Sequence, residues 1–459
     1  MGPLLSALFP VLQNEDLPEN DYVMKCVMRI LSIVGSDVAP VMEDVLEQLT
    51  AALERVCRNP SNPHFNHYLF ESLALLVRSA CSPASTSSSG NSSTQCFDKF
   101  EALLFPPFQS ILQLDVVEFV PYVFQVLGQL LSYRPPGGGL SAAYSDLFPP
   151  LLSPVLWLRR GNVPALTDLV LAYIYQGIGE IVEKGLLEGL LGVFQKLLAS
   201  KVCPVGKVVR HPDLSVIVLL PLQATEVYAF KLINAIVRKC PCDVMDQYMP
   251  MVFQLLLMRL QEHNTQQYCR LFAHFLCATA SSAHGPAYVF HALESIQEGM
   301  NSLIITQIWA PNTEHFSRAD ATDVAQILAG GSLLLCQTPI ADDSSLWGAL
   351  VTSLMGLARC SPSITGDKGD DLLYDEEAEA REFDNTYSKL AYAHILEGAD
   401  DLTAYVKDFA AAQLKFLQEL AALCQRSPGV YAPALQSILG EDDRTALGDM
   451  LSEAGITLA

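Results

Sequence analysis

Acidic side chains crowd one stretch of this 459-residue chain, between residues 367 and 384. Nine acids stand there against two bases, Lys368 and Arg381. Clustered carboxylates could hold Ca²⁺, but the calcium-loop pattern of alternating Asp or Asn around a central glycine is missing. Two interpretations remain open, a solvated linker and a negative strip that faces a basic partner. The candidate partner-binding residues of that strip are Asp370, Asp371, Asp375, Glu376, Glu377 and Glu379.

The other residues that could do chemistry form no complete site. His64 and His67 could share a helix face, but with no Cys or acidic ligand recognised beside them, packing is favoured over metal binding. Cys240 and Cys242 are closer in sequence than the two cysteines of the usual C-x-x-C ligand pair, and no second cysteine pair is present to complete a metal site. Glycines 137–139 lack the following Lys and Ser or Thr of a phosphate loop. We therefore expect no catalytic residue, no metal site and no cofactor.

The twelve cysteines indicate a reducing compartment rather than a disulfide framework. Several of them lie in or beside apolar helical runs, where buried free thiols are common. These are Cys26, Cys57, Cys81, Cys269, Cys277, Cys336 and Cys424.

The net charge indicates which kinds of molecule the chain can bind. The chain carries 50 acidic and 28 basic residues, which gives a net charge of −22. This charge repels nucleic-acid phosphates and anionic lipid, and it favours a basic protein partner. Solubility alone is the alternative explanation of an acidic excess. We expect no nucleic-acid binding and, because no uncharged apolar run reaches roughly 18 residues, no membrane insertion.

The elements that must carry these residues are predicted to be helices. Three sets of apolar residues recur with the spacing of one helix face, and no alternating pattern suggests a sheet. The sets are Phe119, Val123, Val126, Leu127 and Leu130; Leu187, Leu190, Leu191, Phe194, Leu197 and Leu198; and Val406, Ala410, Leu414, Leu417, Ala421 and Cys424. Prolines such as Pro149 and Pro154 are expected to bend these helices or to end them early.

Short strings recur along the chain with a long period. Leu104-Phe105-Pro106-Pro107 returns 43 residues later as Leu147-Phe148-Pro149-Pro150, and Pro121-Tyr122-Val123-Phe124-Gln125 is echoed by Pro250-Met251-Val252-Phe253-Gln254. The offset fits the roughly 40–47-residue period of HEAT and armadillo repeats. We predict an all-α fold, an α-solenoid of about ten antiparallel HEAT helix pairs that spans residues 1–459. The alternative is chance recurrence of an apolar string.

Two further stretches interrupt the helical pattern. Residues 82–94 are rich in serine and predict a mobile loop. The run from Arg134 to Gly139, which contains two prolines and three glycines, predicts a turn between helices.

Longer strings resemble one family and occur in that family's order. The first two are Asn59-Pro60-Ser61-Asn62-Pro63-His64-Phe65-Asn66-His67-Tyr68-Leu69-Phe70-Glu71 and Glu118-Phe119-Val120-Pro121-Tyr122-Val123-Phe124-Gln125-Val126. Residues 151–157, 161–166, 190–197 and, near the end, 387–393 continue the likeness. These strings are similar to the CAS exportins, the importin-α re-exporters of the importin-β or karyopherin superfamily. The likeness is clear to about residue 200, recognisable over 226–298 and weaker afterwards.

The resemblance implies a nuclear export receptor. In that family a HEAT solenoid wraps importin-α together with GTP-bound Ran in the nucleus and releases both in the cytoplasm. It implies shuttling between nucleus and cytoplasm through the nuclear pore, with nucleoporins as further candidate partners, and no enzyme activity. The competing class is a generic HEAT-repeat scaffold for assembling protein complexes, which would share the repeat period but not these strings.

Two departures from the family pattern bear on function. The chain resembles only the C-terminal half of the family, so the N-terminal arch with the principal Ran-binding surface is expected to be absent. A fragment and an incomplete gene model are the two explanations of this absence. Residues 202–223 also interrupt the likeness, because Lys201 should lead almost directly to Ala224. Retained non-coding sequence and a genuine loop are the two explanations of this segment.

Overall fold

The computed structural model of the protein describes residues 2–14, 19–82, 90–135, 137, 139–199, 225–319, 321–360, 389–395 and 408–458. These residues form helices and connecting turns, with no strand among them. They divide into two compact units. Unit 1 comprises Met1–Val193 with Asp371–Glu397, and unit 2 comprises Phe194–Asp370 with Gly398–Ala459.

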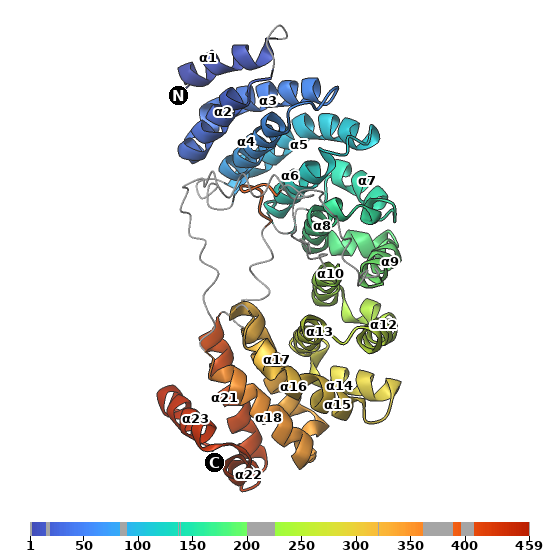
Figure 1. Cartoon of the computed structure of the whole chain (residues 1–459), viewed down its shortest axis with the longest axis vertical. Helices are drawn as coiled ribbons and strands as arrows, with labels where there is room; N and C mark the ends of the chain where they lie inside the picture. The colour runs from blue at the N-terminus through green and yellow to red at the C-terminus, as the bar shows by residue number, and fades with distance from the viewer. Residues whose placement is uncertain are drawn as a thin grey trace, which may run out of the picture. The chain divides into compact units, whose positions relative to one another are not determined.

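Unit 1 is a two-layer stack of helices (Figure 1). In the layer called the even layer here, each helix contacts the next: α2 (Asp21–Val34), α4 (Pro63–Cys81), α6 (Val120–Ser132) and α8 (Val163–Glu183). The second layer contains α1 (Gly2–Gln13), α3 (Met42–Val56) and α5 (Gly90–Gln113), which are again in contact in turn. The helix α7 (Ala142–Leu151) follows, and α9 (Leu187–Leu198) contains the boundary between the units, with residues from Phe194 onward belonging to unit 2. The short helices are η1 (Gly35–Val41), η2 (Leu156–Leu158) and η3 (Arg160–Asn162).

Local sequence explains where these helices begin. The side chain of Asn62 accepts a hydrogen bond of 3.1 Å from the Phe65 amide, which caps α4, and proline occupies the first turns of α4, α6 and α8. Proline is favoured there because its missing N–H would have no partner inside the helix. One pair of the recurring strings noted in the sequence marks equivalent points, since Pro121 is the second residue of α6 and Pro250 is the second residue of α12 (Met249–Glu262).

Aromatic side chains link neighbouring helices of the even layer in the core of unit 1. The Phe70 ring of α4 stacks on Tyr122 at 4.9 Å and meets Phe119 edge-on at 5.3 Å. Aromatic pairs of this kind add to the burial of their apolar area. They join α4 to α6, the two helices that carry the candidate site.

One stretch of unit 1, Arg160–Glu183, has the length and apolar composition of a membrane-spanning helix. It contains α8, and 56% of its most apolar 18-residue stretch is buried inside the protein. Core helices of soluble proteins pass the same test of length and composition, and α8 packs along α6.

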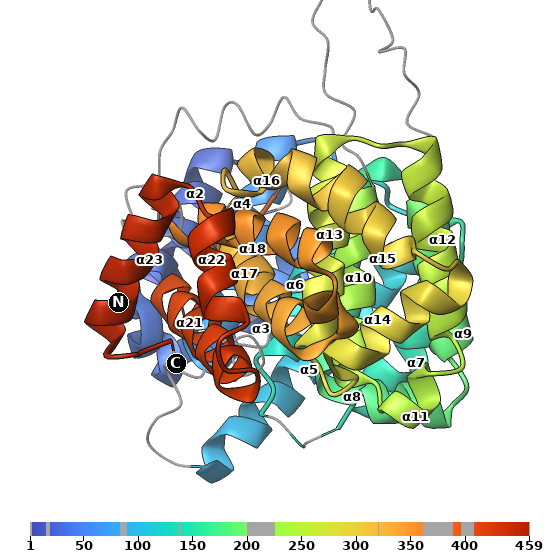
Figure 2. The same cartoon turned by 90° about the horizontal axis from the view of Figure 1, so that it is seen from below.

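Unit 2 repeats the two-layer plan (Figure 1). In Figure 2 its helices can be followed by colour from α10 in green to α23 in red. One layer consists of α10 (Glu226–Lys239), α13 (Gln266–Ala280), α17 (Ala321–Gln337) and α21 (Phe409–Arg426), each in contact with the next. The remaining helices are α11 (Cys242–Met245), α12, α14 (Gly285–Ile296), α15 (Met300–Leu303), the π-helix η4 (Ile304–Trp309), α16 (Ala310–Phe316), η5 (Pro339–Asp342), α18 (Ser344–Ala358), α22 (Tyr431–Ile438) and α23 (Glu441–Ala454).

Close packing in unit 2 depends on a glycine. A Cβ built on Gly330 of α17 would lie 2.3 Å from the carbonyl oxygen of Cys277 and 2.5 Å from its Cα, both in the backbone of α13. Only a residue without a Cβ allows these two helices to approach so closely.

The predicted all-α solenoid fold is confirmed, and so are two of its three apolar faces. Every residue of the sets beginning at Phe119 and Leu187 is buried. The third set is wrong in part, because Leu414 is 42% exposed and Ala410 is also exposed, while Val406 lies outside the described residues. Steps of four residues turn 40° past one full helical turn, so such a set drifts off the buried face of α21. The buried face of α21 instead includes Ala412, Phe416 and Leu420.

Three smaller predictions are settled by the described residues. Residues 83–89 of the predicted Ser-rich loop lie outside the described residues, and its predicted end at residue 94 is too late, because α5 already begins at Gly90. In the predicted turn from Arg134 to Gly139, residues 136 and 138 lie outside the described residues, and the described residues connect α6 to α7 as a turn, with positive φ angles at Gly137 and Gly139. Cys26 was expected among the buried thiols and is exposed, because it lies on the outward face of α2. The proposed interruption at 202–223 lies outside the described residues.

A candidate polypeptide-binding groove on unit 1

Residues 389–395 lie against the even layer of unit 1, although 265 residues separate Leu390 from its partner Gln125. This segment, called the strap here, contains no regular helix or strand. Leu390 is fully buried and Tyr392 is 7% exposed, whereas Ala391 between them is exposed. The surface that receives the strap is called the groove and is formed by Ser32, Glu71, Gln125, Gly128 and Gln129.

Glu71 is the charged centre of the groove. Its side chain on α4 has no exposed surface, and its carboxylate accepts hydrogen bonds from the Ala391 amide at 2.5 Å and the Tyr392 amide at 3.1 Å. His67, one turn earlier, places its Nε2 atom 3.6 Å from the same carboxylate. Successive main-chain N–H groups that converge in this way form a concave site for an anion. The bent strap therefore binds a buried carboxylate with its backbone.

Two glutamines of α6 complete the recognition of the strap backbone. Gln125 Oε1 accepts from the Leu390 amide at 2.8 Å, and Gln129 Nε2 donates to the Tyr392 carbonyl at 2.7 Å. The two glutamines are four residues apart, so they project from one helix face. Gln129 is fully buried, and among the described residues its Oε1 atom has no hydrogen-bond partner. The strap thus leaves one buried acceptor of the groove unmatched.

Side chains fix the strap at two further points. The Tyr392 hydroxyl forms a hydrogen bond with Ser32 of α2. The pKa of Tyr392 is raised, mainly because the side chain is buried and secondly because of the charge of Glu71. The Cγ2 atom of Ile395 would lie 3.4 Å from a Cβ on Gly128, which would also meet the Leu169 backbone of α8 at 3.3 Å. Gly128 therefore leaves room for both the strap and the neighbouring helix.

The residues that the sequence singled out as candidates for binding or metal coordination have different outcomes in the structure. Asp370, Asp371, Asp375, Glu376, Glu377 and Glu379 all lie outside the described residues. His67 is a buried packing group, as predicted, with its Nδ1 atom 3.3 Å from the Tyr122 hydroxyl. The acidic neighbour Glu71 was overlooked. Within the described ranges no group of three or more His, Cys, Asp or Glu could hold a metal ion.

The groove residues themselves were missed by sequence reasoning. One signal was present, because Glu71 is the only acid in the 19 residues of α4, a helix in which most residues are apolar. A charge at a core position of an amphipathic pattern is unusual unless it has a partner. The partner was not readable, since the strap is 320 residues away in sequence.

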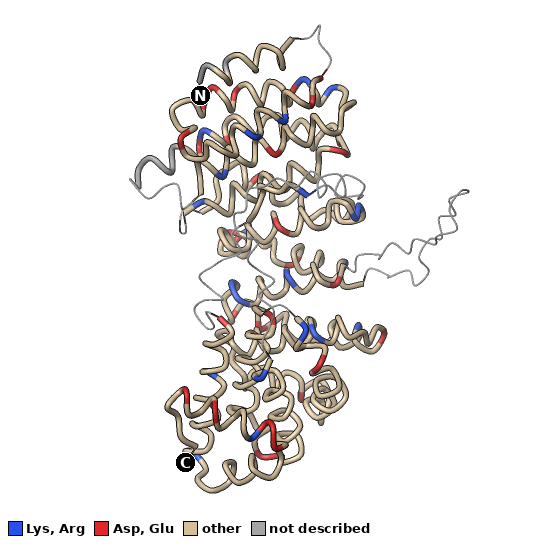
Figure 3. The backbone as a smooth tube through the Cα atoms, turned by 60° about the vertical axis from the view of Figure 1, so that its left-hand side comes forward, with Lys and Arg blue, Asp and Glu red and all other residues tan. Residues whose placement is uncertain are grey.

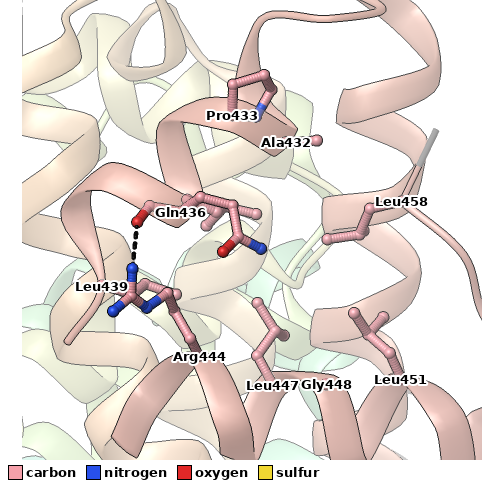
Figure 4. Close-up of a pocket in the computed structure, with 10 residues that line it drawn as sticks. Ala432, Pro433, Gln436, Leu439, Arg444, Leu447, Gly448, Leu451 and Leu458 are labelled. Atoms are coloured by element: carbon pink, nitrogen blue, oxygen red, sulfur yellow. Dashed lines mark hydrogen bonds between the residues drawn. The ribbon is translucent and has the colours of Figure 1, made fainter. Parts of the chain in front are cut away.

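Unit 2 has a pocket of about 590 Å³ between α22 and α23 (Figure 4). Its lining is mainly apolar, and its Arg444 donates a 2.9 Å hydrogen bond to the Gln436 carbonyl. No described side chain other than Arg444 brings a charge to this lining. The pocket therefore offers apolar surface without the convergent polar groups that the groove supplies.

Charged residues of the described helices give no single binding face by themselves. Figure 3 shows acidic and basic positions interspersed along the helices. Several of them pair with each other, as Arg259 and Glu226 do at 2.6 Å in the interior of unit 2. The densest acidic run of the sequence lies outside the residues drawn in colour.

Comparisons with known proteins agree on one family. The chain matches the family model described as "CAS/CSE protein, C-terminus" over residues 1–204 and 216–450. Exportin-2 of Oreochromis niloticus is 35% identical over 396 residues, covering 85% of this chain and 37% of that protein. Exportin-2 of Homo sapiens is 32% identical over 465 residues, covering 99% of this chain and 43% of that protein. The chain thus spans about two fifths of the length of these relatives.

A solved structure has the same fold. The structure titled "The exportin Cse1 in its cargo-free, cytoplasmic state" matches with a TM-score of 0.75 at 21% sequence identity. The match covers 98% of this chain and 42% of that chain.

Proposed function

This chain belongs to the CAS/CSE family, and on that basis we propose that it acts as part of a nuclear export receptor. The observation that carries the proposal is the family match, which leaves out only residues 205–215 and the last nine residues. The role is protein transport by binding, with no chemical step assigned to any residue. Transport in this manner implies shuttling between nucleus and cytoplasm through the nuclear pore.

The partners that we propose are importin-α and GTP-bound Ran, with nucleoporins as contacts during passage. The strings at residues 59–71 and 118–126 support this choice, because they resemble importin-α re-exporters. The net charge of −22 suits basic partner surfaces. In such a receptor each partner would raise the affinity for the other, which is a coupling free energy between two sites.

The geometry of unit 1 is consistent with protein binding. Its even layer already holds a segment of polypeptide through four main-chain hydrogen bonds. Stacked helix pairs present such faces over a long surface, as repeat proteins do when they bind partners. The acidic run Asp370 to Glu379 stays our candidate for a contact with a basic partner.

A binding assay with purified proteins tests the proposal. The chain is immobilised and offered importin-α, Ran loaded with a non-hydrolysable GTP analogue, or both, at about 50 mM salt, where charge attraction is weakly screened. We expect capture of importin-α or of GTP-loaded Ran, with GDP-loaded Ran as the matched control. The export assignment would be overturned in favour of a generic scaffold if the chain captured neither protein. It would also be overturned if the chain did not capture importin-α and captured GDP-loaded and GTP-loaded Ran equally.

A further inference from the structure

The groove recognises the strap mainly through main-chain atoms. Three successive amides, those of Leu390, Ala391 and Tyr392, donate to Glu71 and Gln125, and the Tyr392 carbonyl accepts from Gln129. Only Leu390 and Tyr392 add deeply buried side chains. A site that recognises the backbone conformation of a segment and only two of its side chains is not restricted to one sequence. Another segment with the same bend and the same two anchors would fit it.

The walls of the groove belong to helices that pack against one another. Its residues stand on α2, α4 and α6, and these helices contact one another directly, as α6 also contacts α8. The strap is far from these helices in sequence, since 320 residues separate Glu71 from Ala391. The helix layer therefore supplies the binding surface, and the strap behaves as its ligand.

The strap is also an incomplete ligand. Gln129 Oε1 is buried and has no hydrogen-bond partner among the described residues. A buried acceptor without a donor is unfavourable, so a segment that supplied one would bind more tightly at the same place. Tethering compensates for this defect, because a linked segment is present at an effective concentration of roughly millimolar.

We propose that the groove is an exchangeable polypeptide-binding site, which the strap fills as a tethered self-ligand. The occupant in trans is a bent segment of a partner protein that presents a leucine, a small residue and a tyrosine, with three successive amides directed at Glu71 and Gln125. The proposal goes beyond the export role, because it names a site and a ligand chemistry independently of which partner carries the segment.

Fluorescence anisotropy with a labelled peptide of residues 387–397 tests the exchange. The full chain carrying Leu390→Asp and Tyr392→Asp has an emptied groove. We expect it to bind the peptide at least tenfold more tightly than the unaltered chain, where the tethered strap competes. In the emptied chain Glu71→Gln should weaken binding at least tenfold. Glu118→Gln, the same change at an exposed acid of unit 1, should leave binding unchanged.

Peptide variants keep the test decisive if Glu71→Gln fails to fold. N-methylation of the amides corresponding to Ala391 and Tyr392 removes the two donors to Glu71 and should abolish detectable binding. Replacement of the tyrosine corresponding to Tyr392 by alanine should weaken binding at least tenfold. The proposal is overturned if the emptied chain keeps its helical circular dichroism but binds no peptide, or if N-methylation has no effect. It is equally overturned if emptying the groove unfolds unit 1, because the strap is then part of the core. None of these results depends on importin-α or Ran.

Discussion

At the scale of the residue, the most informative side chains are buried polar groups with specific partners. Glu71 binds the strap, and in unit 2 Arg259 donates to Glu226 through both its Nε atom, at 2.8 Å, and its Nη2 atom, at 2.6 Å. Buried charges of this kind require a partner, because desolvation without one is costly. Such residues report long-range contacts that apolar periodicity does not reveal.

Gly330 permits the close approach of α13 and α17, and its replacement should therefore destabilise unit 2. We expect Gly330→Ala to lower the free energy of unfolding by about 1–3 kcal/mol, the usual range for overpacking. Gly448→Ala is the matched control, since nothing lies within 4 Å of a Cβ there. In α23 it should raise stability by about 0.5–1 kcal/mol. Urea unfolding of both variants checks this, and a loss at both positions would argue against a role for the α13–α17 contact.

His284 should make the stability of unit 2 depend on pH. Its Nδ1 atom lies 3.3 Å from the Asp246 carboxylate, and the ring of Tyr288 lies at a tilt beside its own, with 4.8 Å between the ring centroids. Burial lowers the pKa of His284, and the charge of Asp246 opposes this shift only in part. A lowered folded-state pKa means that the unfolded chain binds more protons below about pH 6.5, so stability falls as the solution becomes acidic.

A His284→Gln variant isolates this effect. The difference in unfolding free energy between the unaltered chain and the variant should shrink between pH 7 and pH 5, measured by urea unfolding at each pH. If Asp246 instead dominated, the folded-state pKa would be raised and the difference would grow in acid. That result would contradict the burial argument.

At the scale of the element, caps and prolines set the helix boundaries and glycines set the packing distances. Asp408 caps α21 by accepting from the Ala411 amide at 2.7 Å, and Asp343 caps α18 by accepting from the Ser345 and Leu346 amides. The strap is a different kind of element, because hydrogen bonds to α4 and α6 hold it in place without any helix of its own.

The two ends that flank residues 202–223 are already held together. The Thr225 hydroxyl, at the start of α10, donates a 2.8 Å hydrogen bond to the Leu197 carbonyl of α9. Deletion of Val202 to Gln223 would leave Ala199, Ser200, Lys201 and Ala224 to connect them. We expect the melting temperature to stay unchanged or to rise after this deletion. A fall of several degrees would indicate that the segment packs on the fold and is native to it.

At the scale of the whole molecule, the chain offers binding surface on two solenoid units and a strongly negative charge. The six acids of the candidate strip, Asp370, Asp371, Asp375, Glu376, Glu377 and Glu379, stand close together in sequence, so they should act as one electrostatic patch. Attraction between exposed charges weakens as salt rises, because the Debye length shrinks to about 8 Å at 0.15 M.

Replacing all six acids by Ser or Gln should weaken binding to Ran or importin-α and flatten its salt dependence. Dissociation constants measured between about 50 and 200 mM salt check this. The matched control removes the same charge from six scattered exposed acids, Asp37, Asp44, Glu54, Glu188, Glu298 and Glu453. If both variants bind alike, net charge alone is responsible and the strip is a solvated linker.

The amino-acid sequence by itself determined the fold class of this protein. Helical spacing around Phe119 and Leu187, and prolines at 121 and 250, are local signals, and local hydrogen bonding and burial act on them directly. The helical spacing predicted buried residues correctly, and the two prolines, which entered the prediction only as part of a recurring string, lie in the first turns of α6 and α12. The same reasoning predicted the buried face of α21 wrongly in part, because the spacing of apolar residues does not show which side of a helix packs against its neighbours.

Only the tertiary structure decided where the groove lies. Glu71 and Gln125 are separated from the strap by 320 and 265 residues, and no local pattern records a contact over that distance. The contact arises when packing of α2, α4 and α6 brings a buried carboxylate and two amides onto one face, where a bent backbone can satisfy them. Buried polar groups must find partners wherever the fold supplies them, so the candidate site of this chain became visible only with its packing.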